Sequence, residues 1–99
     1  MSDDTLVQSV RGIAESLRML NERALQEYTP LVAGIVRSDS RDIRPIEQTL
    51  DGLLGFCGHA PAVDLYRKLC RHYWQINPAA TAGYVNGYRE IWHSEAGRA

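Results

Sequence analysis

The stretch FCGHAPAVDLYRKLCRHYW, residues 56–74, predicts a helical hairpin. Gly58 suits a left-handed residue that closes one helix, and Pro61 suits the first turn of the next. From Pro61 to about Ile76, apolar residues, including Trp74, occupy one half of the helical wheel and polar residues the other. Helices joined by a turn this short pack as antiparallel neighbours.

The segment before the hairpin also has helical spacing. Ser38 to Asp42 reads as a loop, and Asp42 suits the N-cap of a helix that ends at Cys57. One apolar stripe along this predicted helix consists of Ile43, Ile46, Leu50, Leu53, Leu54 and Cys57.

The first 28 residues carry a seam of heptad type. Its members are Leu6, Val10, Ile13, Leu17, Leu20, Ala24 and Tyr28. We expect Thr29-Pro30 to stop this helix, because proline lacks the backbone N–H that a helix interior needs. A short second helix should then run from Pro30 to Val36.

After the hairpin, Asn77 suits a cap and Pro78 a first helical residue, so a last helix should continue to about Trp92. The fold class is therefore predicted as all-α, a compact antiparallel bundle of four to five helices. We expect one domain over residues 2–94 and a short polar tail over residues 95–99.

Composition limits the classes of function. The chain has 99 residues, 44% hydrophobic residues and a formal charge of −1, so no general attraction to nucleic acid or anionic membranes is expected. The acidic start, Met1 to Asp4, is unlike a secretory signal, and the longest apolar stretch, Leu31 to Val36, is too short to span a bilayer. We expect a cytoplasmic protein with no membrane partner.

Two Cys-x-His units, at Cys57-Gly-His59 and Cys70-Arg-His72, raise the question of a zinc site. Residues two apart on a helix point about 160° apart, and zinc ligands normally come as C-x₂₋₄-C or H-x₃₋₅-H pairs. We therefore expect two reduced core cysteines, a turn histidine at His59, and His72 at the edge of the polar half of its helix. No metal ion or cofactor is predicted.

Enzyme signatures are missing from the sequence. It contains no G-x-S-x-G, phosphate-binding glycine loop or H-E-x-x-H motif. A thiol at Cys57, near a predicted helix C-terminus, would meet the negative end of the helix dipole, which disfavours the thiolate. We expect no enzymatic activity.

Apolar and aromatic residues exceed what a small bundle readily hides, which favours a protein–protein interaction domain. The partner would be a second copy, giving a homodimer, or another protein. Candidate partner-binding residues are Leu6, Val10, Ile13, Leu17, Leu20, Phe56, Trp74, Tyr84, Tyr88 and Trp92. The sequence leaves open whether the aromatic members belong to the core or to an interface.

A small DNA-binding regulator is the alternative. Arg67, Lys68 and Arg71 lie on the polar face of the second hairpin helix and could contact phosphates, as in a helix-turn-helix. Asp64 lies nearer the start of that helix and would repel phosphate, so we prefer the protein-binding interpretation.

Overall fold

The structure, a computed structural model, describes residues 2–93. Within this range the chain forms four α-helices followed by a π-helical turn, Arg89–His93, and no strand. The α-helices are α1 (Ser2–Arg37), α2 (Ile43–Leu54), α3 (Ala60–Trp74) and α4 (Pro78–Tyr88). The predicted all-α bundle is confirmed. Residue 94 and the tail predicted for residues 95–99 lie outside the described residues.

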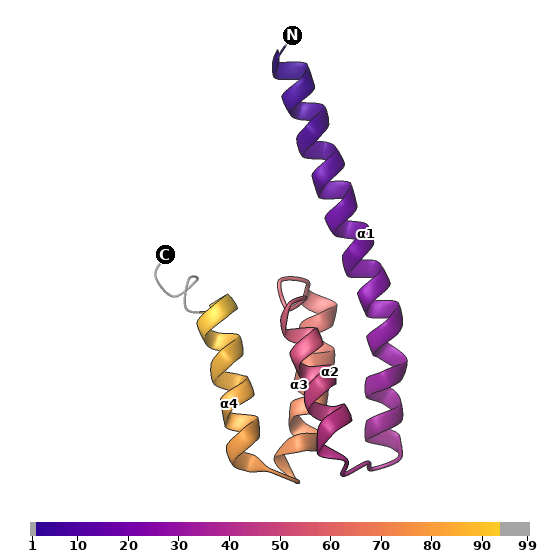
Figure 1. Ribbon diagram of the computed structural model, residues 1–99, viewed down its shortest axis with the longest axis vertical. Helices are drawn as coiled ribbons and strands as arrows, with labels where there is room; N and C mark the ends of the chain where they lie inside the picture. Colours follow the sequence, from indigo (N-terminus) through magenta and orange to yellow (C-terminus); the bar gives the residue numbers. More distant parts are fainter. Residues whose placement is uncertain (1, 94–99) are drawn as a thin grey trace.

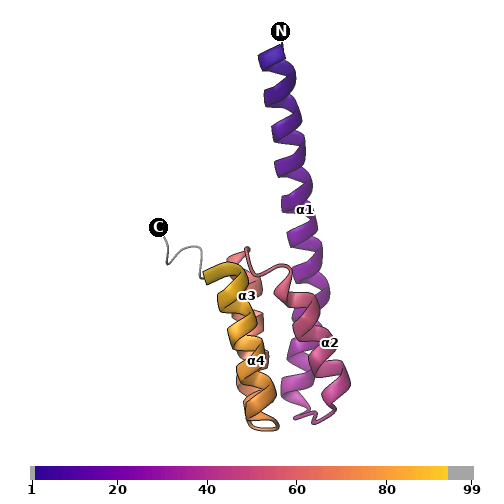
Figure 2. The same cartoon turned by 60° about the vertical axis from the view of Figure 1, so that its left-hand side comes forward.

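α3 is the central helix of the bundle. It packs against α1, α2 and α4, and successive helices run in opposite directions (Figures 1 and 2). The connections cover residues 38–42, 55–59 and 75–77, so each is short enough to force the chain back along its neighbour.

The core lies where α2 and α3 meet the C-terminal part of α1. The largest fully buried side chains are Tyr73, Ile46, Leu50, Leu53, Leu69 and Val32. Two buried phenols keep a hydrogen bond there, because the Tyr66 hydroxyl donates to the Tyr84 carbonyl at 2.7 Å and the Tyr73 hydroxyl donates to the Glu47 carboxylate.

The predicted stop at Thr29-Pro30 is wrong, because α1 continues through Pro30 to Arg37. Proline removes the N–H that would bond to the Gln26 carbonyl. Both Pro30 and Gln26 are exposed, so water can satisfy that carbonyl. Val32, which follows the proline, is fully buried in the bundle, and this packing holds the helix beyond the proline in place.

Since α1 is one helix, it is much longer than the helices it packs on. Its 36 residues span about 54 Å, against about 22 Å for the 15 residues of α3. The N-terminal half of α1 projects beyond the bundle (Figure 1). The Cα radius of gyration is 16.4 Å, above the ~13 Å usual for a domain of about 100 residues.

The turn between α2 and α3 differs from the prediction. α2 ends at Leu54 instead of Cys57, and no described glycine has a positive φ, so Gly58 is not a left-handed cap. The Trp92 ring lies against Gly58, where an added Cβ would stand 3.0 Å from a ring carbon. Glycine is therefore needed here for close approach.

Gly52 of α2 also permits a close contact. An added Cβ at this position would overlap the Tyr28 hydroxyl, so the glycine lets α1 and α2 approach closely.

The two predicted N-caps differ in the structure. The predicted cap at Asn77 is confirmed, since its side chain accepts a 3.1 Å hydrogen bond from the Ala80 N–H. Asp42 occupies the N-cap position of α2 without a side-chain cap bond.

Replacing Pro30 by alanine tests the continuity of α1. Pro30→Ala restores the N–H donor in the helix interior and should raise the free energy of unfolding by about 1–3 kcal/mol. Urea denaturation measures the change. The control is Pro61→Ala, because Pro61 lies in the first turn of α3, where a missing N–H costs little. A Pro30→Ala variant no more stable than the wild type would mean that the helix is interrupted at this position.

Candidate protein interface

The most prominent surface feature is an apolar seam on the projecting half of α1. We define the α1 seam as Leu6, Val10, Ile13, Leu17 and Leu20, each 55–63% exposed. These residues follow the spacing four, three, four, three, so they share one face of the helix. Monomeric proteins rarely leave a continuous row of large apolar side chains in water.

The flanks of the α1 seam carry little charge. Val7 and Ala14 each directly follow a seam residue on one flank. On the other flank, Ser9 and Ser16 each directly precede a seam residue. Arg23, seven residues after Ser16, is a charged residue on this flank. On another side of the helix, Arg18 forms intrahelical ion pairs with Glu15 and Glu22. A helix packed against this face would meet no unpaired charge at the centre of the contact.

Ala24 links the α1 seam to the bundle. It is only 6% exposed and begins the face that packs on α2 and α3 through Tyr28 and Val32. Leu31, seven residues after Ala24, continues the heptad series instead and is 51% exposed. The heptad series is therefore covered at Ala24 and exposed again at Leu31. The sequence reasoning missed this position because it placed Leu31 in a separate helix.

A small groove lies where the α1 seam meets the bundle. Its volume is about 210 Å³, and its lining includes Leu20, Ala24, Tyr28 and Phe56. Phe56 is half-buried against Tyr28, with ring centroids 6.3 Å apart. Of the predicted partner-binding aromatics, Phe56 is thus the one adjoining the α1 seam.

The other predicted aromatics divide between the core and the surface. Tyr84 and Tyr88 are half-buried, and their rings lie 6.4 Å and 6.1 Å from those of core tyrosines. Trp92 is partly exposed, and its indole N–H donates to the Leu54 carbonyl at 2.9 Å. Trp74 is 55% exposed, so it belongs to the surface although the sequence pattern places it with the apolar half of α3. It lies seven residues after Arg67 and therefore shares the cationic face.

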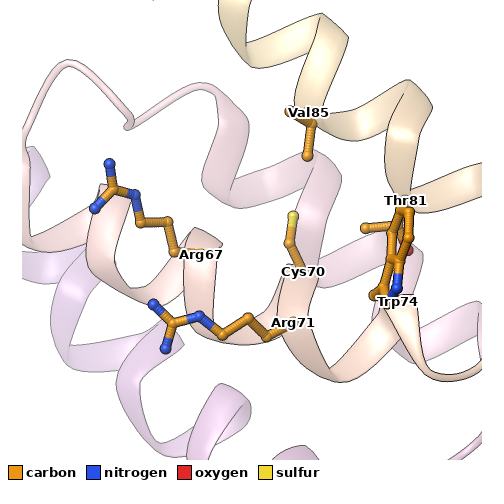
Figure 3. A pocket seen from close by; sticks show the side chains of 6 residues that line it. All are labelled: Arg67, Cys70, Arg71, Trp74, Thr81 and Val85. Carbon is orange, nitrogen blue, oxygen red and sulfur yellow. The ribbon is translucent and has the colours of Figure 1, made fainter. Parts of the chain in front are cut away.

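A second surface feature is a groove between α3 and α4, shown in Figure 3. Its volume is about 450 Å³. The α3–α4 groove is lined by Arg67, Cys70, Arg71, Trp74, Thr81 and Val85. The guanidinium groups of Arg67 and Arg71 extend to one side, away from Trp74, while the Cys70 thiol and Val85 point toward one another. Lys68 is exposed as well, so the three predicted cations all reach solvent.

The paired Cys-x-His units serve packing. Cys57 and Cys70 are buried free cysteines, as predicted. His59 is the N-cap residue of α3 and lies in a turn. His72 is only 7% exposed, which corrects its predicted place at a polar edge. The loop after α1 covers it, and its Nε2 lies 2.6 Å from the Ser40 carbonyl.

The chemistry of these thiols is that of core residues. Burial raises the pKa of Cys57 and of Cys70 to about 11, so the thiolate is scarce at neutral pH. Among the described residues, no group of three His, Cys, Asp or Glu side chains is placed to hold a metal ion. Within the same part of the chain, no helix has the length and apolar character needed to cross a bilayer.

Comparisons with known proteins give no relative. No protein-family model matches the chain, and neither a curated protein nor a solved structure is significantly similar to it. The functional argument therefore depends on the surfaces described above.

The buried thiols give a testable pH dependence. Both cysteines keep their protons in the folded state to higher pH than in the unfolded state, so unfolding releases protons between about pH 9 and 11. The free energy of unfolding should therefore fall as pH rises through this range. Buried tyrosines such as Tyr73, whose pKa burial raises to about 12, act in the same direction.

Urea titrations at several pH values measure this effect. Cys57→Ala and Cys70→Ala should each remove part of the decline between about pH 9 and 11. Below pH 8, each variant should differ in stability from the wild type only through the packing lost with the side chain. If both variants keep the full decline, the thiols do not titrate as buried groups.

Proposed function

We propose that this protein is a non-enzymatic protein–protein interaction domain that binds a helical partner through the α1 seam. The observation that supports this most strongly is the exposure of the five seam side chains over about two heptads. The partner is a second copy of the chain or another protein. The two free, buried cysteines support action in a reducing, cytoplasmic environment.

Burial of the α1 seam would release substantial free energy. Complete burial of a Leu, Ile or Val side chain is worth about 1.5–3 kcal/mol, and more than half of each seam side chain is still exposed. Each residue can therefore contribute about 1 kcal/mol or more to binding. The bundle holds the C-terminal part of α1 in place, so less conformational entropy is lost when a partner binds the projecting half.

Charged substitutions in the α1 seam test the proposal. Ile13→Glu together with Leu17→Glu should lower the association constant at least 100-fold, because two carboxylates would be desolvated in the contact. Sedimentation equilibrium measures self-association, and pull-down with identified partners measures binding to other proteins. Circular dichroism checks that the bundle remains folded.

Met19 supplies the matched control. It is 59% exposed but lies about 140° around α1 from the centre of the seam. Met19→Glu should leave association unchanged. Equal effects of the seam and Met19 variants would contradict the proposal.

Nucleic-acid binding through the α3–α4 groove is a second candidate. It is favoured by the exposure of Arg67, Lys68 and Arg71 beside an exposed indole, a combination suited to phosphates and bases. At low salt, Arg67→Glu with Arg71→Glu should abolish binding of a mixed-sequence duplex or single strand in a fluorescence anisotropy assay. The charge-matched control is Arg11→Glu with Arg44→Glu, on α1 and α2. No binding by the wild-type chain at low salt would contradict this candidate.

A further inference from the structure

We propose that the α1 seam binds a second copy of this chain, with the two α1 helices antiparallel and Ile13 of each copy opposite Leu17 of the other. This inference rests on the proposed function and names its partner. It follows from the order of residues in the seam, its flanks and the position of the bundle.

One antiparallel register matches every apolar heptad position from Val10 to Leu20. In it the residue numbers of facing seam side chains add up to thirty, so Val10 faces Leu20 and Ile13 faces Leu17. The twofold axis then gives the same two contacts again, so that four apolar layers form. Leu6 comes beside Ala24, which its own bundle already covers, so this pair adds no full layer.

The neighbouring registers are worse. A shift of one heptad in one direction sets Val10 against Glu27, which would bury a carboxylate against an apolar side chain and cost free energy. A shift in the other direction leaves Leu20 opposite no residue of the α1 seam.

Side-chain shape disfavours a parallel pair. A parallel dimer prefers Leu at the positions held here by Leu6, Ile13 and Leu20, and Ile13 departs from that preference.

The position of the bundle gives a second reason. Ala24 belongs both to the heptad stripe and to the face buried by the bundle, so the bundle lies on the side of α1 toward which the seam points. A parallel pair would bring both bundles to the same end of that side. The antiparallel pair separates the two Ala24 positions by 18 residues along the axis, about 27 Å.

The flanks agree with this register. Ala14 faces Ala14 and Ser16 faces Ser16 on either side of the twofold axis, which permits close helix approach. Farther out, Ser9 faces Arg23, so this flank pair brings no two like charges together.

Each end of the pair lies near the groove where the α1 seam meets the bundle. Leu6 of the second copy would come close to this groove, whose lining includes Leu20 and Phe56 together with Arg23 and Glu27. The contact would therefore end at a groove with both apolar and charged walls.

Spin-label distances between two copies test the orientation. The single variants Ser16→Cys and Ser9→Cys place labels on the same flank of the α1 seam, one heptad apart. Residue 16 lies near the proposed twofold axis and residue 9 lies far from it. The axial offset between equivalent labels is about 3 Å at residue 16 and about 18 Å at residue 9. We therefore expect the Ser9→Cys distance to exceed the Ser16→Cys distance by about 10 Å. The wild-type chain, whose two cysteines are buried, controls for background labelling.

The other outcomes separate this inference from the proposed function. Equal distances at the two positions would mean a parallel pair, which overturns the antiparallel inference and leaves the α1 seam as an interface. A monomer with no intermolecular distance at high concentration would overturn the second copy as partner, while pull-down with the seam variants still judges another protein. A dimer unaffected by Ile13→Glu with Leu17→Glu would contradict both.

Discussion

The difference in length between α1 and the rest of the bundle is the constraint on which this structure depends. α1 has apolar residues on one face along almost its entire length, but α2 and α3 cover only its C-terminal part. Because Val32 is fully buried after Pro30, the bundle fixes the direction in which the projecting half points. The uncovered apolar face is therefore a consequence of the fold.

The same constraint separates the molecule into parts with different physical tasks. Around α3, aromatic and aliphatic residues make a core whose polar atoms are paired, as for Tyr66 and Tyr73. Its cysteines are protonated packing residues with a raised pKa. The α1 seam instead has the apolar pattern of the face by which a bundle helix packs on a neighbour, but its side chains are exposed. Our proposal gives this neighbour the identity of a second α1.

Periodic features were predictable from the sequence, whereas features that depend on tertiary contacts were not. The heptad seam, most of the α2 stripe and the cap at Asn77 follow from local spacing and side-chain chemistry, and the structure contains them. Of the predicted stripe, Ile43 is exposed and Cys57 lies beyond the end of α2. The stop at Pro30 failed because an exposed carbonyl tolerates the missing donor and packing holds both sides. His72 is buried because the loop ending near Ser40 folds over it, a contact between residues 32 apart in sequence. Trp74 is exposed because it lies seven residues after Arg67 and therefore on the same side of α3 as this exposed arginine. The exposed Leu31 joins the heptad series only once α1 is one helix.

Amide hydrogen exchange in α1, followed as a function of protein concentration, tests most directly whether the α1 seam is an interface between copies. Protection of the amides of residues 6–20 should rise as the concentration increases through the dissociation constant, since pairing suppresses opening of the projecting helix. Protection of the amides around Leu50 and Leu69 in the bundle should change far less. Fast exchange in residues 6–20 that is independent of concentration, with a stable bundle, would contradict the account.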